Sequence, residues 1–303
     1  MKDLYFLSNI CEVGLDVPSF STFGSGGNLA CVAYPKTAEE LLKATSILDA
    51  EGVEYITLGA CSNTLISDDG VDSVVISTRR LKGKTLEGDN LYLLAGERMS
   101  SICKLACENS LSGIEGLCSI PGSIGGGLVM NCGAFGRELG DIVEYADLLI
   151  DGKIERFKAE DLDFAYRHSK VKDLGIAVGV CLRLVEGDKR RIIKDMKGYA
   201  IARGKSQPKG KSLGSVFKKA GETSAGYYID KAGLKGYKIG GAQISDMHAN
   251  FILNSGGATS MDFLRLADYA RQEVDKQFGV KLKYEVDYIP KCHLERSRED
   301  SSD

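Results

Sequence analysis

The segment from Cys118 to Gly136, with the sequence CSIPGSIGGGLVMNCGAFG, constrains the fold more than any other part of the chain. It contains six glycines, one proline and no charged residue, together with large apolar side chains such as Leu128 and Phe135. Ordered glycine loses more conformational entropy than other residues, so its repeated use indicates positive-φ turns or close approach of the backbone to a neighbour. The apolar side chains argue against a surface linker. We therefore expect a packed loop whose backbone lies against another segment or a ligand.

Composition excludes several classes of protein. The 303 residues carry a formal net charge of −3, with 43% hydrophobic and 27% charged residues, which is ordinary for a globular protein. We expect no nucleic-acid or membrane partner, because we find no basic stripe, polybasic helix, signal peptide or long apolar run. The nine cysteines form no C-x-x-C motif and the three histidines are scattered, so we expect neither a metal site nor a disulfide framework.

Apolar periodicity and turn signals predict an α+β fold rather than a doubly wound parallel sheet. Thr37 and Glu40 form a capping box at the start of a helix, and Asp151-Gly152 separates two strand-like runs as a hairpin turn would. The expected helices are 101–111, 189–203 and 260–278, and the expected strands are 53–58, 74–77, 91–94, 142–150, 153–157, 176–184 and 283–289.

The helix at 189–203 precedes a candidate domain joint. Its predicted inward residues are Ile192, Ile193, Met196 and Tyr199. The following stretch, 204–212, is charged and rich in breakers, so we interpret it as a loop.

Three loops rich in Gly, Ser and Asn, at 24–28, 59–64 and 122–127, favour an anionic ligand. The glycine loops do not have the spacing of a dinucleotide fingerprint, and no G-K-[ST] follows them as it would in a P-loop. Successive backbone N–H groups in such loops form anion-binding nests, and Ser123 is placed to begin a short helix whose N-terminus favours phosphate. A single loop is more often a packing turn, but three together favour the ligand interpretation.

Seven blocks spread in order over roughly residues 15–290 resemble the UDP-N-acetylenolpyruvoylglucosamine reductase (MurB) family. They are STFGSGGN at 21–28, LGACSNTLISDDG at 58–70, GIEGLCSIPGSIGGGLVMNCGAFGRE at 113–138, YRHS at 166–169, GSVFKK at 214–219, AGLKGYKIGGAQISDMHANFILN at 232–254 and FGVKLKYEVDYI at 278–289. The resemblance implies a flavin-binding region of the vanillyl-alcohol-oxidase (PCMH) type, followed by a substrate-binding domain. It also implies non-covalent FAD, NADPH as reductant, a UDP-sugar enolpyruvyl ether as substrate, and a cytoplasmic place in peptidoglycan precursor synthesis.

The implied domain boundaries follow from this resemblance. Residues 1–188 are expected to bind FAD, as two subdomains of about 1–80 and 81–188, and residues 189–290 to bind substrate. The polar end, 291–303, is expected to be a loose tail, and the protein is expected to be a monomer.

The implied reaction delivers a hydride from reduced flavin to a vinyl carbon and a proton to its neighbour. Arg167 matches the family arginine that would clamp the substrate carboxylate, and a guanidinium suits this role because it stays charged and binds bidentately. Ser215 matches the family proton donor, which needs nearby positive charge because a free hydroxyl is a very weak acid. Glu285 matches the glutamate that acts with the arginine around the enol intermediate. We expect the three side chains to converge in one cleft.

The resemblance also implies binding residues. Those carried over for FAD are Gly59, Ser62, Asn63, Thr64, Pro121, Gly122, Ser123, Gly126, Asn131 and Gly133, and the substrate candidates are Tyr166, Lys218, Tyr227, Tyr228 and His248. No histidine lies in a flavin loop, which indicates non-covalent flavin. Only 48 positions separate Arg167 from Ser215, which is typical of the shorter subclass without a tyrosine-loop insert.

The chain departs from the family pattern at four places. Ala60-Cys61 replaces glycines, Lys219-Ala220 replaces Asn-Pro, Lys205 precedes the usual lysine position, and Met247 replaces a common lysine. These changes bear on flavin and substrate affinity more than on reaction type. Two alternatives stay open at this point: another FAD-dependent oxidoreductase of the same flavin fold, and a non-enzymatic nucleotide-binding protein.

Overall fold

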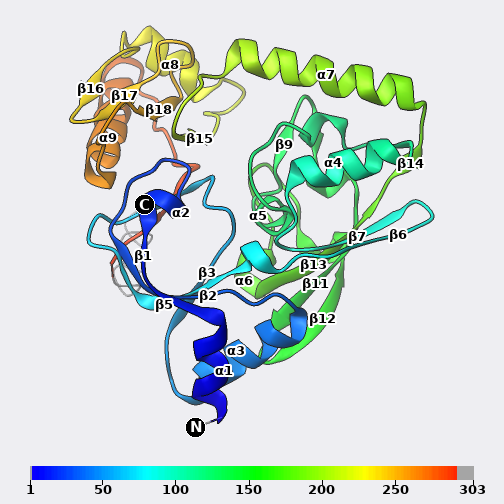
Figure 1. Cartoon of the computed structure of the whole chain (residues 1–303). Helices are drawn as coiled ribbons and strands as arrows, with labels where there is room; N and C mark the ends of the chain where they lie inside the picture. The colour runs from blue at the N-terminus through cyan, green and yellow to red at the C-terminus, as the bar shows by residue number, and fades with distance from the viewer. Residues whose placement is uncertain (1, 292–303) are drawn as a thin grey trace. The chain divides into compact units, whose positions relative to one another are not determined.

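The chain forms two compact units, each assembled from three separate stretches of sequence (Figure 1). A computed structural model describes residues 2–291, so the tail prediction for 292–303 lies outside the described residues. Unit 1 comprises the residues up to 12, 32–60 and 75–203, and unit 2 comprises 13–31, 61–74 and the residues from 204 onward. Both units contain helices together with antiparallel sheets, which confirms the α+β class.

Unit 1 is built on a five-stranded antiparallel sheet in the order β12-β11-β13-β7-β6. Its strands are β6 (Lys84–Glu87), β7 (Asn90–Leu94), β11 (Val143–Ile150), β12 (Lys153–Lys158) and β13 (Ile176–Arg183). Asp151 and Gly152 join β11 to β12 with φ values of 46° and 73°, and two positive φ angles are what a type I′ hairpin turn requires. The predicted hairpin is therefore confirmed. The short helix α5 (Ile124–Val129) contacts β13 and β7.

Helix α3 (Ala38–Ala50) begins where the capping signal placed it. The Thr37 hydroxyl accepts a bond from the Glu40 amide, whereas the Glu40 carboxylate accepts from the amide of Lys36 rather than of Thr37. The other elements of unit 1 are α1 (Lys2–Ile10), β3 (Tyr55–Leu58), η1 (Thr78–Arg80), α4 (Met99–Glu108), β8 (Leu111–Ser112), η2 (Glu115–Leu117), β9 (Gly133–Ala134), β10 (Arg137–Glu138), η3 (Leu139–Asp141), η4 (Ala159–Leu162), α6 (Val171–Leu174) and β14 (Val185–Glu186).

Helix α7 (Lys189–Ser206) is longer than predicted and buries a narrower stripe. Ile192 is 3% exposed, and Tyr199, seven residues on, stacks on Phe135 with ring centroids 4.6 Å apart. Ile193 is 37% exposed, so its predicted inward position is wrong. One helical residue turns the side chain by about 100°, which carries Ile193 off the face shared by Ile192 and Tyr199. The predicted loop at 204–212 is wrong for its first three residues, because the helix continues to Ser206.

Unit 2 packs a four-stranded antiparallel sheet, in the order β15-β18-β17-β16, with helix α9 (Ser260–Phe278). The other elements are α2 (Val17–Phe20), β4 (Thr64–Ile66), β15 (Ser212–Ser215), α8 (Ala225–Lys231), β16 (Lys238–Ile239), β17 (Ala242–Ile244), β18 (Phe251–Asn254) and β19 (Asp287–Ile289). The rings of Phe23 and Phe263 meet edge to face at 5.1 Å in its core. The last strand is shorter than predicted, and β19 pairs in parallel with β4.

A further sheet has the order β1-β2-β5-β3 and includes β1 (Cys11–Asp16), β2 (Asn28–Ala33) and β5 (Val71–Ser77). Within residues 2–291, no group of three His, Cys, Asp or Glu side chains is arranged to hold a metal ion. No helix in this described part combines the length and the apolar character needed to cross a lipid bilayer.

Candidate active site

The three consecutive glycines of α5 have different surroundings. The Ser123 hydroxyl caps the helix by accepting from the Gly126 amide. A Cβ on Gly125 would lie 2.8 Å from the Ala95 Cβ, and one on Gly127 would lie 2.9 Å from the Cys132 Sγ, so packing excludes side chains at both positions. Among the described residues, a Cβ on Gly126 would meet only the Ser123 Oγ, at 3.6 Å. Gly126 is exposed and has no packing reason to be glycine, which indicates a surface kept bare for a ligand.

The surroundings of Gly126 suit the polar phosphates of FAD. Gly59 adjoins the same loop, because its Cβ would lie 3.0 Å from the Ser123 Oγ. Gly122 has φ +129°, and within residues 2–291 the amides of Gly122 and Ser123 donate no hydrogen bond. Backbone donors without a protein partner beside a bare glycine fit a bound diphosphate.

Gly126→Val tests whether this bare surface holds the cofactor. We expect FAD affinity to fall about tenfold or more, since a misfitting side chain in a packed contact costs about 1–3 kcal/mol. The measurement is the flavin absorbance per protein after gel filtration and dialysis against known FAD. Gly198→Val is the matched control, because Gly198 is also exposed on a helix and has open space around it. If the Gly126→Val protein retained a full complement of FAD, this loop would serve only as a packing turn and not as a cofactor site.

The remaining FAD candidates of the glycine segment lie in three different settings. Pro121 is exposed at the start of the loop. Gly133 lies in the β9–β10 hairpin, where a Cβ would come within 2.8 Å of the Glu138 Cγ. Asn131 is 1% exposed and bonds to neighbouring segments through its side chain.

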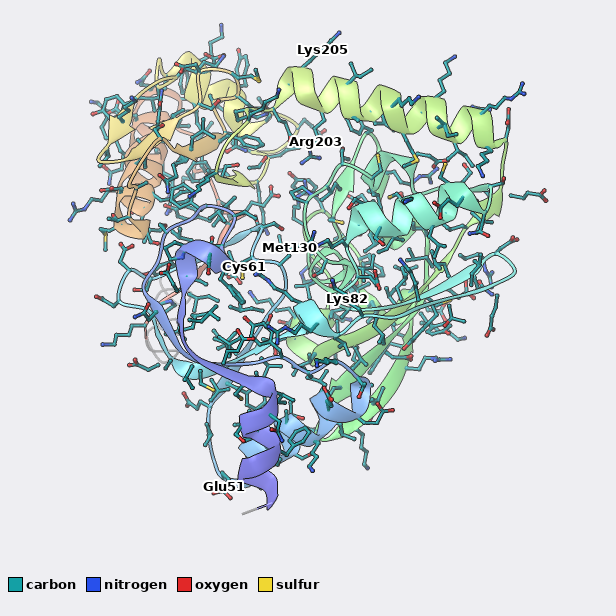
Figure 2. All side chains as sticks on the ribbon, in the orientation of Figure 1. Glu51, Cys61, Lys82, Met130, Arg203 and Lys205 are labelled. Carbon is teal, nitrogen blue, oxygen red and sulfur yellow. The ribbon has the colours of Figure 1, made fainter. Side chains whose placement is uncertain are left out.

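Arg167 lies in unit 1 on a tight hairpin closed by Ala165 and His168. Its guanidinium lies 5.2 Å from the centroid of the Tyr166 ring, within the range of a cation–π contact. Arg203 is a neighbour that the sequence interpretation missed: burial lowers the pKa of its guanidinium, and the charge of Arg167 lowers that pKa further. Figure 2 shows Arg203 and Lys205 leaving α7 on opposite sides. Helical spacing gave a usable signal, because Arg203 is four residues after Tyr199 and so shares the buried stripe.

The thiols near these arginines are structural. Burial raises the pKa of Cys132 to about 12, although Arg167 and Arg203 oppose the shift. Burial also raises the pKa of Cys118, whose Sγ lies 3.9 Å from the Met196 carbonyl oxygen. Both thiols therefore stay protonated near neutral pH and act as small apolar groups.

Ser215 and Glu285 lie in unit 2 on neighbouring backbone segments. Ser215 ends β15 and pairs with Phe251 of β18. The next residue, Val216, accepts the Glu285 amide through its carbonyl at 2.8 Å. The two residues are 70 positions apart in sequence, so this pairing brings together two of the three predicted catalytic positions.

Two residues assigned to FAD hold the Glu285 segment in unit 2. The Asn63 Nδ2 donates to the Glu285 carbonyl at 2.8 Å, and the Asn63 carbonyl accepts the Asp287 amide at 3.0 Å. Thr64 pairs with Asp287 in the parallel β4–β19 ladder. Ser62 precedes them, and Cys61 is buried with φ +50°.

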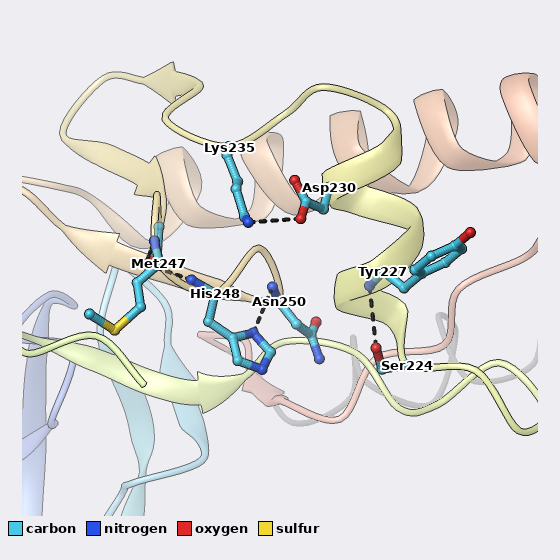
Figure 3. Close-up of polar contacts among 8 residues, drawn as sticks. Ser224, Tyr227, Asp230, Lys235, Met247, His248 and Asn250 are labelled. Carbon is cyan, nitrogen blue, oxygen red and sulfur yellow. Dashed lines mark hydrogen bonds and ion pairs between the residues drawn. The ribbon is translucent and has the colours of Figure 1, made fainter. Parts of the chain in front are cut away.

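His248 lies in a polar cluster of unit 2 beside α8 (Figure 3). Burial lowers its pKa, and the charge of Lys235 lowers it further. The neutral ring accepts the Asn250 amide at Nδ1, 3.2 Å away, while Lys235 pairs with Asp230 at 2.7 Å. Tyr227 is 52% exposed and meets Tyr228 edge to face at 5.5 Å.

Asn250 links this cluster to the strand of Ser215, and the sequence offered no signal for it. Its Oδ1 accepts the Phe217 amide at 3.0 Å and its Nδ2 donates to the Phe217 carbonyl at 2.8 Å. Its own carbonyl accepts the Val216 amide at 2.8 Å. Lys218 follows directly, with its amide donating to the Lys283 carbonyl. Asn250 therefore fixes the backbone just after Ser215.

Comparisons with known proteins cover both parts of the chain. A family model described as an FAD binding domain matches residues 29–158, and the model of the C-terminal domain of UDP-N-acetylenolpyruvoylglucosamine reductase matches residues 207–289. The reductase of Caldicellulosiruptor bescii is 33% identical, over 95% of this chain and 94% of the relative. The chain belongs to the UDP-N-acetylenolpyruvoylglucosamine reductase family.

Other members of the reductase family show the same extent of similarity. The reductase of Synechococcus sp. (strain JA-3-3Ab) is 38% identical over 92% of this chain and 91% of the relative. The crystal structure of the reductase from Thermus caldophilus has a TM-score of 0.80 and 34% identity, covering 92% of this chain and 98% of that chain. The resemblance and the FAD-binding region expected from the motifs are confirmed.

Proposed function

We propose that the chain reduces UDP-N-acetylglucosamine enolpyruvate to UDP-N-acetylmuramate, with NADPH as reductant and non-covalent FAD. The observation that carries this function is the 33% identity to a curated reductase over 95% of the chain. The enzyme is an oxidoreductase and flavoprotein of peptidoglycan synthesis. We further propose that it acts in the cytoplasm as a monomer without nucleic-acid partners, and that it serves cell wall biogenesis and through it cell shape and division.

We assign FAD to residues 1–188 and substrate to residues 189–290. Bound FAD supplies the hydride. The backbone of Gly122 and Ser123, with the bare Gly126 beside them, supports binding of the diphosphate. Pro121 lies at the start of this loop and Gly59 adjoins it. Gly133 in the β9–β10 hairpin is assigned to the same cofactor, as are Ser62, Asn63 and Thr64.

The catalytic roles belong to three side chains. Arg167 binds the substrate carboxylate and stabilises the negative charge that develops beside it. Ser215 donates a proton from its hydroxyl, and Glu285 acts with Arg167 around the enol. Tyr166, Lys218, Tyr227, Tyr228 and His248 are assigned to substrate binding. The exposed ring of Tyr227 and the short bond between Lys235 and Asp230 support a polar surface there.

An anaerobic two-step titration tests this function. The purified protein should be yellow, NADPH should bleach it, and UDP-N-acetylglucosamine enolpyruvate should restore the oxidised flavin spectrum in stoichiometric amount. Reoxidation by oxygen but not by this substrate would indicate an oxidase with the same flavin fold. A colourless protein that cannot be loaded with FAD would leave only a non-enzymatic nucleotide-binding role.

A further inference from the structure

The hairpin that carries Arg167 is held in an unusual conformation. Ala165 and His168 exchange both backbone hydrogen bonds, with N···O distances of 3.1 and 3.0 Å. Between them, Arg167 has φ +55°, a left-handed conformation that residues other than Gly, Asn and Asp seldom adopt. Such a conformation persists only where surrounding contacts fix it. The contacts at the base of this hairpin therefore determine where the guanidinium of Arg167 projects.

Asn131 makes the first of these contacts from the glycine segment, just after the end of α5. Its Nδ2 donates to the Ala165 carbonyl at 3.0 Å and to the Glu138 Oε2 at 2.8 Å. Its Oδ1 accepts the Gly140 amide at 2.8 Å. An asparagine amide group has two hydrogens, so both donors are already used within the protein. The side chain joins three segments of unit 1 and has no donor left for a cofactor.

Ser169 makes the second contact from the other side of the hairpin. It is 2% exposed, and its Oγ lies 2.9 Å from the Leu128 carbonyl oxygen and 3.0 Å from that of Val129. These carbonyls belong to the last turn of α5, where helical carbonyls lack partners within the helix. The single hydroxyl hydrogen is shared between them. The segment after Arg167 is thus bonded directly to the helix that begins at Ser123.

We propose that Asn131 and Ser169 are positioning residues that couple the flavin loop to Arg167. They tie the base of the Arg167 hairpin to the C-terminal end of α5, so that the loop assigned to FAD and the arginine assigned to the substrate carboxylate keep a fixed spacing. This inference rests on the proposed function, which gives Arg167 its role. It reassigns the side chain of Asn131 from cofactor binding to positioning.

Four variants of the full-length, flavin-loaded protein test the coupling. Asn131→Gly removes the side chain at a position whose φ of +39° glycine tolerates, and Asn131→Asp keeps the shape but replaces the donor with an acceptor facing Glu138. Ser169→Ala removes the hydroxyl, and Ser169→Thr retains it. Each variant is measured for FAD content, thermal unfolding, the rate of flavin reduction by NADPH, and kcat and KM for the enolpyruvyl substrate.

We expect Asn131→Gly, Asn131→Asp and Ser169→Ala to lower kcat/KM for the substrate by about 10–100-fold, because misplacing a binding group by about 1 Å has effects of this size. FAD content and flavin reduction by NADPH should stay at wild-type levels, and Ser169→Thr should recover most of the activity. In the Arg167→Lys background, Asn131→Gly should lower kcat/KM little further, because both changes impair the same contact between Arg167 and the substrate.

Three results would overturn the coupling. Loss of FAD from Asn131→Gly would make Asn131 a cofactor ligand, and wild-type kcat/KM in the variants would remove any positioning role. Full additivity of Asn131→Gly with Arg167→Lys would indicate a general effect on stability. If the wild-type protein takes up FAD but never reduces the substrate, the proposed function itself fails, and this inference fails with it.

Discussion

Ser215→Ala is expected to slow reduction of the enolpyruvyl substrate by about 10²–10⁴-fold, the usual contribution of a positioned proton donor. Reduction of bound FAD by NADPH should proceed at the wild-type rate, because that step needs no proton from Ser215. The backbone of the strand should be unaffected, since Ser215 is held through its pairing with Phe251 and through the bond from the Val216 amide to the Asn250 carbonyl. The loss would then belong to the hydroxyl group itself.

Stopped-flow measurement of the two half-reactions separates these effects. Flavin bleaching by NADPH reports the first half-reaction, and flavin reoxidation by substrate reports the second. Ser212→Ala is the matched control, because Ser212 lies on the same strand and is proposed to have no chemical role. Substrate reduction at the wild-type rate in Ser215→Ala would refute the assignment of Ser215 as proton donor.

Arg167→Lys should lower kcat/KM for the substrate by roughly 10²-fold, a loss comparable with removing one donor that stabilises transition-state charge. Lysine keeps the positive charge but cannot bind a carboxylate through two parallel N–H groups. Arginine and lysine experience the same backbone strain at the φ of +55° found at position 167. The variant therefore changes the charged head group with little change in local strain. The expected deficit is therefore one of binding geometry rather than of charge.

Steady-state kinetics and unfolding measurements check this expectation together. Arg183→Lys is the control, because Arg183 is exposed and pairs with Glu144 on the sheet, where a lysine can replace it. Its kcat/KM and its thermal stability should match the wild type. An Arg167→Lys protein as efficient as the wild type would show that no bidentate clamp operates at this position.

Local features of the fold were predictable from the sequence because short-range chemistry determines them. The hairpin at Asp151-Gly152 follows from two residues that tolerate positive φ. The start of α3 follows from the Thr37 cap, and α9 occupies the predicted range from Ser260 to Phe278. Turn and cap residues act on their immediate neighbours, so one short stretch of sequence contains the whole signal.

The candidate site was predictable in its residue types but not in its contacts. Motif resemblance identified Asn131 as important without revealing that its amide bonds to Glu138, Gly140 and Ala165. Nothing in the sequence pairs Asn250 with Phe217 or Asn63 with Glu285, which are separated by 33 and 222 positions. Such contacts depend on which distant strands meet, and this is decided by packing of the whole unit.

The parallel pairing of β4 with β19 has a consequence for the order in which the chain folds during synthesis. Unit 2 needs residues 61–74 from the first quarter of the chain and residues 287–289 from its end. On a ribosome, all of unit 1 emerges before β19 exists, so β4 lacks its partner strand until the stretch 75–203 has emerged. Pairing β4 with β19 at the end closes a large loop of chain, and such a long-range contact slows folding. A protein fragment spanning only 207–289 would lack strand β4, and its last strand would present an unpaired edge.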